Sequence, residues 1–292
     1  MTTPDHAPAA VASTPPPGAE PDEVVVPLRH YGRTTLAVFV ILLILGMGYG
    51  LATNDHIEWS IIGQYFANGA VLQGLWVTLQ MTVLAMILGL LLAVVLAVMR
   101  ISNSRVLSGI SWAYVFFFRS IPMIVLLIFV GNIGLFIKEI VIGIPFTDIV
   151  FFEVATKNFM SPFIASVLSL VLVASAYMAE IVRGGLLAVN QGQRQAAKAL
   201  GLNGAQTLQR IVLPQALRVI VPPLGNELVN TIKATALVSV IAGGDLLTIV
   251  QSISGVNYKV IEMLLVATIW YILVIGLWSI AQYFIERRTA ER

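Results

Sequence analysis

Long stretches of this sequence contain no charged residue, and their length constrains the fold more than any other feature. A helix rises about 1.5 Å per residue, so about 20 apolar residues cross the roughly 30 Å of hydrocarbon in a bilayer. Apolar stretches, one interrupted by Arg119 and one by Pro222, Pro223, Glu227 and Lys233, lie at 35–52, 71–99, 106–137, 158–179, 219–244 and 263–285. The sequence therefore predicts an all-α polytopic membrane protein with about six transmembrane helices.

The composition supports this class and excludes several others. Hydrophobic residues make up 58% of the 292 residues and charged residues only 11%, whereas soluble domains have about 25% charged residues. The formal net charge of +2 is too small for binding driven by charge, so we expect no nucleic-acid partner. Cysteine is absent and the three histidines are scattered, so no disulfide, thiol nucleophile or metal site is expected.

The distribution of basic residues predicts the orientation in the membrane. If the N-terminus is inside, twelve lysines and arginines lie beside the cytoplasmic ends of the spans, and only Lys138, Lys157 and Lys259 lie outside. Basic residues close to a span favour the cytoplasmic side. We therefore expect a multi-pass protein of the cell (plasma) membrane with a cytoplasmic N-terminus and a cytoplasmic C-terminus.

The expected core occupies residues 71–285, and shorter segments flank it. Residues 1–34 include the run Pro15-Pro16-Pro17-Gly18 and predict a disordered cytoplasmic tail, because they offer too little apolar surface to offset chain entropy. An extra N-terminal transmembrane helix is expected at 35–53. A cleavable signal peptide is the alternative, although this stretch is longer than the usual apolar region and starts far from Met1. Residues 286–292 are expected to form a cytoplasmic C-terminal tail.

The long cytoplasmic connection at 187–218 predicts a helix–turn–helix. Its first helix is expected to end near Leu200, because Gly201 commonly follows the last turn of a helix. Asn203 and Gln206 have the spacing of a capping box, which predicts a second short helix that ends before Pro214. From these residues alone, a surface hairpin that merely joins two spans remains the alternative.

In this connection Gln195-Ala196-Ala197 is followed after three residues by Gly201 and, after nine more, by Ile211, any residue and Leu213-Pro214. This order resembles the EAA loop of ABC importer permeases. That pattern is Glu-Ala-Ala, three residues, Gly, nine residues and Ile-x-Leu-Pro, and six of its seven fixed positions match here. Gln195 stands where the family has Glu, so an ion pair at this position is lost. The resemblance implies that the 195–214 loop docks onto a separate ATPase. The residues expected to take part are Gln195, Ala196, Ala197, Gly201, Asn203, Ile211, Leu213 and Pro214.

Further motifs resemble one branch of these permeases, the polar-amino-acid importers of the histidine/glutamine/glutamate type. They are Gly74-Leu75-Trp76-Val77-Thr78-Leu79, Arg119-Ser120-Ile121-Pro122, the stretch from Ser175 to Gly185, and the stretch from Lys233 to Ile241. The resemblance implies a type I importer core of five helices after the extra N-terminal helix. It also implies the transmembrane subunit of an ATP-driven importer that passes polar amino acids from an extracytoplasmic binding protein into the cytoplasm.

The resemblance implies a subunit and not a complete transporter. The sequence contains no Gly-x4-Gly-Lys-Ser/Thr loop, so a partner ATPase is expected to bind ATP and Mg, and no cofactor is expected in this chain. The outer loops are too short to form a substrate-binding domain. The expected partners are a cytoplasmic ABC ATPase, a second permease subunit (a copy of this chain or a paralogue), an extracytoplasmic amino-acid-binding protein and membrane lipid.

Polar and charged residues within the spans are candidates for lining a translocation path. A charge at the bilayer centre costs about 2.5–3.5 kcal/mol on insertion scales, so it usually faces protein or a water-filled cavity. The candidates are Arg119, Glu180, Asn226, Glu227 and Lys233. The structural alternative for Glu180 is an intrahelical ion pair with Arg183. For Arg119 it is extension of the side chain to the lipid headgroups. Pro222-Pro223 predicts a bend that frees carbonyl groups near Asn226 and Glu227.

Two features near the C-terminus are expected to be structural or peripheral. Asp245 follows Gly243-Gly244 and is expected at the outer end of a helix, where it could touch a binding protein. Trp270, Tyr271 and Trp278 are expected to serve in packing and at the membrane interface.

Two other function classes are kept as alternatives to a permease subunit. A stand-alone secondary transporter or channel would call for an internal inverted repeat or carboxylate-rich spans, and neither is found in the sequence. An intramembrane enzyme would need a paired Asp, Ser–His or His–Glu constellation within the spans, and the sequence has none.

Overall fold

The structure is a computed structural model that describes residues 31–143 and 150–290 and divides into two compact units, Met1–His56 and Ile57–Arg292. Most of the expected N-terminal tail, residues 1–30, lies outside the described residues. In the first unit, helix α1 (Tyr31–Ala52) has no buried residue. The expected boundary between the tail and the first span, at residue 34, is therefore wrong by one turn, because the helix already begins at Tyr31.

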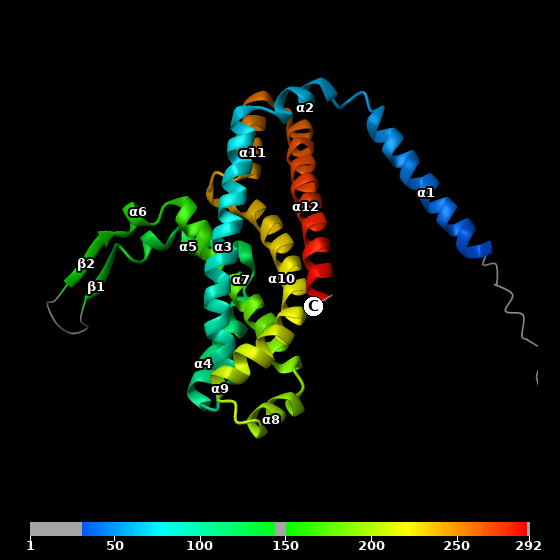
Figure 1. Ribbon diagram of the computed structural model, residues 1–292. Helices are drawn as coiled ribbons and strands as arrows, with labels where there is room; N and C mark the ends of the chain where they lie inside the picture. The colour runs from blue at the N-terminus through cyan, green and yellow to red at the C-terminus, as the bar shows by residue number, and fades with distance from the viewer. Residues whose placement is uncertain (1–30, 144–149, 291–292) are drawn as a thin grey trace, which may run out of the picture. The chain divides into compact units, whose positions relative to one another are not determined.

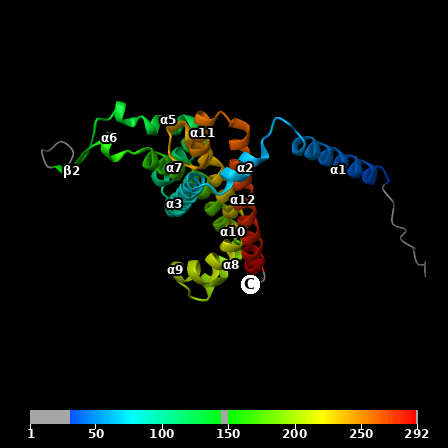
Figure 2. The same ribbon diagram turned by 90° about the horizontal axis from the view of Figure 1, so that it is seen from above.

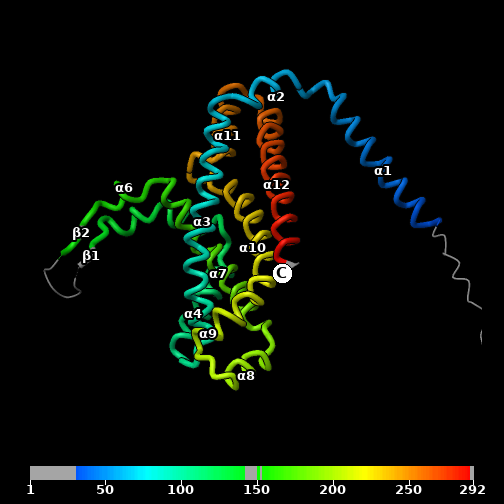
Figure 3. The backbone as a smooth tube through the Cα atoms, in the orientation of Figure 1, coloured from blue at the N-terminus to red at the C-terminus, as the bar shows by residue number. Residues whose placement is uncertain are grey.

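The second unit is a bundle of long helices (Figure 1). Its helices are α2 (Trp59–Phe66), α3 (Gly69–Ile101), α4 (Arg105–Ser120), α5 (Met123–Gly131), α6 (Thr156–Phe159), α7 (Pro162–Ala188), α8 (Gln191–Ala199), α9 (Gly204–Thr207), α10 (Leu213–Ala234), α11 (Leu246–Asn257) and α12 (Val260–Ala290). Shorter turns are η1 (Ile133–Leu135), η2 (Leu208–Val212) and η3 (Thr235–Ile241). Helix α7 packs along α3 and α10, and the views in Figures 2 and 3 show the same arrangement.

Four helices in the described ranges are long and apolar enough to cross a membrane, namely α1, α3, α7 and α12. Two bent pairs raise the number to six if each pair is one span: α4 with α5, bent by 99°, and Gly204–Ile241 with α11, bent by 45°. The expected stretch 106–137 is therefore a broken span. Ile121 and Pro122 are both extended, with ψ of 132° and 129°, because a proline disfavours helical backbone in the residue before it.

Helix α10 continues through Pro222 and Pro223 without a break in the helix, so the two prolines do not divide this span into separate helices. Side chains of α12 support this stretch, since Trp278 Nε1 donates to the Gly225 carbonyl oxygen at 3.1 Å and Gln282 Nε2 donates to the Pro222 carbonyl oxygen at 3.3 Å. These bonds attach this stretch of α10 to α12. The real break in this span lies further along, between η3 and α11.

A two-stranded antiparallel ribbon lies where an irregular outer loop was expected between the third and fourth spans. Strand β1 (Glu139–Gly143) pairs with β2 (Val150–Ala155), with Ile140 opposite Val154 and Val141 opposite Glu153. Branched and aromatic residues dominate both strands and favour extended backbone. The predicted all-α class is confirmed for the bundle, and the ribbon is an addition to it.

The last helix exceeds the expected span of 263–285 at both ends. Helix α12 begins at Val260 and continues to Ala290, so most of the expected C-terminal tail, residues 286–292, is helical. Arg287 and Arg288 lie in its last turn, where basic side chains interact favourably with the helix dipole. Residues 291–292 lie outside the described residues.

Short helix α2 is fastened to α12 at the end of the bundle opposite α8 and α9 (Figure 1). The Trp270 ring stacks on Phe66 with centroids 4.7 Å apart, and its Nε1 donates to the Phe66 carbonyl oxygen at 2.9 Å. The Glu58 backbone N–H donates to the Glu262 carboxylate at 3.2 Å. The Glu58 carboxylate accepts a hydrogen bond from the Lys259 ammonium, and this bond raises the pKa of Lys259 above its ordinary value.

Helices α7 and α10 approach most tightly at Gly185. A Cβ atom at this position would lie 2.2 Å from Cγ1 of Ile220 and 3.2 Å from the Ala216 carbonyl oxygen. We expect Gly185→Val to destabilise the protein, because overpacking of a close helix contact costs about 1–3 kcal/mol. Gly184→Val is the matched control, since no atom lies within 4 Å of a Cβ there. Thermal unfolding in detergent should show a lower Tm for Gly185→Val alone, and equal Tm values would contradict the prediction.

Candidate functional site

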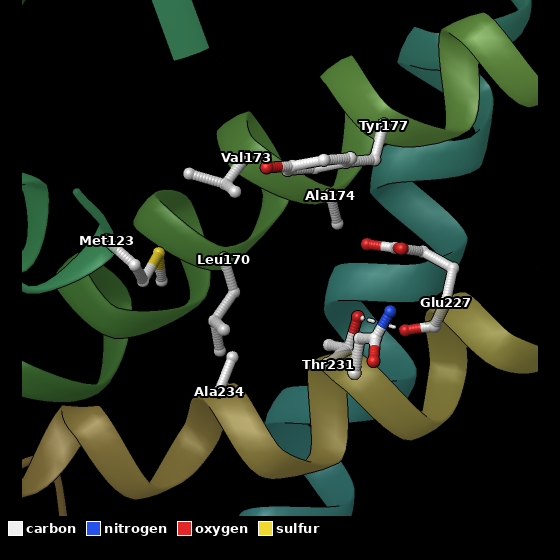
Figure 4. A pocket seen from close by; sticks show the side chains of 9 residues that line it. Met123, Leu170, Val173, Ala174, Tyr177, Glu227, Thr231 and Ala234 are labelled. Carbon is white, nitrogen blue, oxygen red and sulfur yellow. Dashed lines mark hydrogen bonds between the residues drawn. The ribbon is translucent and has the colours of Figure 1, made fainter. Parts of the chain in front are cut away.

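Helices α5, α7 and α10 enclose a pocket of about 340 Å³ (Figure 4). Its lining is mostly apolar, and its one charged residue is Glu227. The lining residues are Met123, Leu170, Val173, Ala174, Tyr177, Glu227, Asn230, Thr231 and Ala234. Figure 4 shows the Tyr177 ring and the Glu227 carboxylate facing this pocket from α7 and α10. We call it the carboxylate pocket.

A second pocket of about 390 Å³ lies among α3, α4 and α7, and we call it the guanidinium pocket. It is lined by Arg100, Trp112, Val115, Phe116, Arg119, Ser120, Tyr177 and Glu180. The Arg119 guanidinium carbon lies 5.1 Å from the centroid of the Tyr177 ring, a distance at which a cation and a ring face attract each other. Tyr177 lines both pockets and is the one residue common to the two linings.

The expected intrahelical pair of Glu180 with Arg183 is confirmed. Arg183 donates from Nε at 2.9 Å and from Nη2 at 2.7 Å to the same carboxylate oxygen of Glu180. Glu180 also lines the guanidinium pocket, so this pair lies at the pocket wall. The paired arginine compensates part of the carboxylate's charge at a place where an isolated charge would be costly.

The structure brings three of the five path candidates to these pockets and leaves two outside. Arg119, Glu180 and Glu227 line them, whereas Asn226 and Lys233 are exposed and line neither. The reason is the regular geometry of α10, in which successive residues are turned by about 100°. Neither residue therefore shares the face of Glu227. The roles of all five residues remain predictions.

Sequence reasoning missed Tyr177, Asn230 and Thr231. The last two follow Glu227 by three and four residues, so helical spacing places them on the same face once this part of α10 is known to be helical. Thr231 donates its hydroxyl to the Glu227 carbonyl oxygen at 2.9 Å within the helix. No comparable signal in the sequence singles out Tyr177, because its position between the pockets depends on the packing of α4 against α7.

The predicted coupling loop begins with α8, whose end has the geometry expected of Gly201. The Gly201 N–H donates to the Lys198 carbonyl oxygen and the Leu202 N–H donates to the Ala197 carbonyl oxygen, both at 3.0 Å. These two bonds form a Schellman motif, which requires a left-handed residue after the helix. Gly201 supplies it with φ of +78°.

The second half of the loop contains the predicted capping box. Asn203 accepts from the Gln206 N–H at 2.9 Å and Gln206 accepts from the Asn203 N–H at 3.0 Å. The expectation that the helix ends before Pro214 is wrong. The chain continues from α9 through the π-helical turn η2 into α10, and Pro214 lies in the first turn of α10, where its missing N–H has no cost.

Exposure within the loop separates docking candidates from supporting residues. Gln195 and Ala196 are exposed, whereas the Ala197 side chain is only 3% exposed and packs inward. Leu200, which sequence reasoning missed, is 81% exposed beside Gly201. Leu187, Leu208, Leu213 and Leu217 are also exposed, so the surface of this loop is partly apolar.

The remaining docking candidates lie in and after the second half of the loop. Gly201, Asn203, Leu213 and Pro214 are exposed, and Ile211 is half-buried in η2. A hollow of about 530 Å³ separates α8 from α9 and η2. Its lining residues are Gln191, Arg194, Gln195, Lys198, Leu202, Gly204, Thr207, Leu208 and Val212. The loop therefore presents a cleft as well as an exposed tip.

Comparison with known proteins relates these features to a family. Residues 85–291 match the family described as binding-protein-dependent transport system inner membrane component. The arginine transport system permease protein ArgU of Corynebacterium glutamicum is 36% identical over 263 residues, which are 89% of this chain and 81% of that protein. The L-cystine transport system permease protein TcyB of Bacillus subtilis is 32% identical over 240 residues, covering 82% of this chain and 94% of that protein.

A solved structure supports the same relationship. The crystal structure of an amino acid ABC transporter with histidines has a TM-score of 0.67 and 29% sequence identity, and covers 80% of this chain and 99% of that chain. The predicted ABC importer permease is confirmed, and ATP hydrolysis belongs to a partner subunit. Such a transporter requires both an ATPase and a binding protein. The chain belongs to the binding-protein-dependent transport system inner membrane components and is the multi-pass inner-membrane permease subunit of an ABC importer.

Proposed function

We propose that this permease passes a polar amino acid from an extracytoplasmic binding protein into the cytoplasm. The observation that carries the proposal is the position of Tyr177, which lines both a pocket containing Glu227 and a pocket containing Arg119 and Glu180. Both named relatives are amino-acid permeases, one for arginine and one for L-cystine. The volumes of about 340 and 390 Å³ also fall within the usual range for small-molecule sites.

The charges of the two pockets suit a zwitterion. Glu227 offers a carboxylate to the ammonium group of an amino acid, and Arg119 offers a guanidinium to its carboxylate. Apolar neighbours such as Met123 and Leu170 exclude water from the carboxylate pocket and strengthen these interactions. The Tyr177 ring between the pockets attracts a passing ammonium group through its face.

We further propose that the 195–214 loop is cytoplasmic and docks onto the ATPase, and that both termini are cytoplasmic. The excess of lysine and arginine on this side supports the orientation, and the exposed Leu200 supports the docking. ATP and Mg then bind to the partner ATPase, and the cycle requires no cofactor in this chain.

A second permease subunit, a copy of this chain or a paralogue, completes the proposed transporter. The exposed Asn226 and Lys233 lie on a membrane-spanning helix. Polar side chains at such positions generally face protein or water and not lipid. They are therefore proposed to face the second subunit or the water-filled path between the two subunits.

The test is transport by the reconstituted system. Proteoliposomes that contain this permease, its ATPase and the binding protein are supplied with a panel of radiolabelled polar amino acids, including arginine, glutamine and cystine. We expect uptake of at least one of them that requires ATP and the binding protein and that stops with a hydrolysis-deficient ATPase. Uptake by the permease alone, driven by an ion gradient without ATP, would contradict the proposal and favour a secondary transporter.

A further inference from the structure

A buried polar cluster lies at the break between η3 and α11, outside both pockets and outside the coupling loop. It consists of Asp245, Thr78 of α3 and Thr248 of α11, and we call it the outer latch. Asp245 is 0% exposed and Thr78 is 1% exposed. The expectation that Asp245 touches a binding protein is therefore wrong, because the surrounding helices cover the carboxylate.

The outer latch holds the first turn of α11. The Leu246 N–H donates to Oγ1 of Thr78 at 3.0 Å, so this bond links α11 to α3. The Asp245 carboxylate accepts from the Leu247 N–H at 3.0 Å and from the Thr248 N–H at 3.4 Å, and the Thr248 hydroxyl also donates to it. A helix start leaves N–H groups that need partners. Here one partner comes from another helix, so displacement of α11 from α3 must break that bond.

The backbone before the latch has the geometry of a hinge. Ala242 and Gly244 have φ of 52° and 85°, and they separate a 3-10 turn from α11. A non-glycine residue with positive φ is strained, and such strain is common where a structure has two arrangements. Close contact surrounds this point, since a Cβ at Gly74 of α3 would lie 2.8 Å from Cγ1 of Ile249.

The neighbouring helix α12 packs against α11 beside the latch. The ring of its half-buried Tyr271 packs against the apolar cluster that contains Leu246 and Val250 of α11.

We propose that Thr78 is a positioning residue of the transport cycle, which holds α11 against α3 until α11 swings about the Ala242–Gly244 hinge, while Asp245 caps the first turn of α11. Helix α10 runs from the coupling loop to η3 and the hinge (Figure 3), so movement of the loop reaches α11 through one helix. The latch therefore limits the rate at which the transporter hydrolyses ATP when no binding protein is present. This inference goes beyond the cargo path and rests on the proposed docking of the 195–214 loop onto the ATPase.

Thr78→Val tests the latch, because valine keeps the shape of threonine and removes the acceptor for the Leu246 N–H. In the reconstituted transporter we expect basal ATP hydrolysis without binding protein to rise by about two- to tenfold, the factor that corresponds to one hydrogen bond. The relative stimulation by binding protein should fall. Thr82→Val is the matched control, since buried Thr82 lies one turn along α3 and donates within its own helix to the Thr78 carbonyl oxygen at 2.9 Å.

A labelling measurement reports the movement of α11 directly. The chain contains no cysteine, so Val250→Cys, at a buried position of α11, introduces a single thiol. Its reaction with a membrane-impermeant maleimide should be faster in the Thr78→Val background and unchanged in the Thr82→Val background. If Thr78→Val does not fold, Thr78→Ala, which also removes the acceptor for the Leu246 N–H, takes its place and should give the same two changes.

Two results would overturn the proposal. In one, basal hydrolysis and labelling are the same in Thr78→Val as in the unmodified protein. In the other, Thr78→Val and Thr82→Val lower hydrolysis to the same extent, as expected of a purely structural role. Neither readout depends on which cargo is carried, so failure of the proposed cargo path would leave this test intact.

Discussion

Replacement of Gly201 with valine is expected to lower ATP-driven uptake by at least about tenfold while the chain still inserts into the membrane. Gly201 has φ of +78°, and a β-branched residue in this conformation costs on the order of 1–3 kcal/mol. The Schellman bonds to the carbonyl groups of Ala197 and Lys198 would then be lost or displaced. Because these bonds set the direction of the chain after α8, the exposed Leu200 would move away from the ATPase.

Two variants serve as controls for the Gly201 prediction. Gly201→Asn should retain most of the uptake, because asparagine tolerates positive φ far better than valine. Gly204→Val places the same side chain in the same loop at a position where no atom lies within 4 Å of a Cβ and φ is not positive. Uptake in proteoliposomes and co-purification of the ATPase are the measurements. Normal uptake by a correctly inserted Gly201→Val protein would show that this loop geometry is not needed for coupling.

Replacement of Glu227 with glutamine is expected to reduce uptake by about ten- to a hundredfold. A hydrogen bond to a charged group contributes about 1.5–3 kcal/mol, and the loss of that free energy corresponds to this factor. Glutamine keeps the size of glutamate and its ability to accept hydrogen bonds, so the carboxylate pocket keeps its shape. The loss is the negative charge that would attract the ammonium group of the cargo in an apolar surrounding.

The control for Glu227→Gln is Glu153→Gln, which neutralises an exposed carboxylate on the β ribbon outside both pockets. Basal ATP hydrolysis should be unchanged in both variants, because neither residue lies in the coupling loop. The concentration dependence of uptake, measured with saturating binding protein, should change for Glu227→Gln alone. Equal uptake by the two variants would remove Glu227 from the proposed path.

The coupling loop was the part of the site best predicted from sequence. Its turn at Gly201 and its capping box at Asn203 and Gln206 both appear in the structure. Both motifs join groups within five residues of each other in the chain, so the chemistry that determines them is local. The predicted end of the second helix was wrong because proline is acceptable both in the first turn of a helix and after the end of one. Only the continuation of the chain into α10 shows that Pro214 lies in a first turn.

The prolines show where local chemistry no longer suffices. Pro122 lies at a 99° break between α4 and α5, whereas Pro222 and Pro223 lie inside an unbroken helix. Near the latter pair, Trp278 and Gln282 of α12 bond to carbonyl groups of α10. Those partners are 53 and 60 residues away in the chain, so no window of sequence around the prolines contains these contacts.

The sequence by itself determined that this chain spans a membrane, where its spans lie and which family it belongs to. Those properties follow from the cost of charges in hydrocarbon and from short motifs, and both can be read along the chain. Only the tertiary structure decided that Tyr177 lines both pockets, that Asn226 and Lys233 lie outside them, and that Asp245 is buried beside Thr78. Each of these depends on which faces of separate helices meet, because packing between distant segments determines where a side chain points.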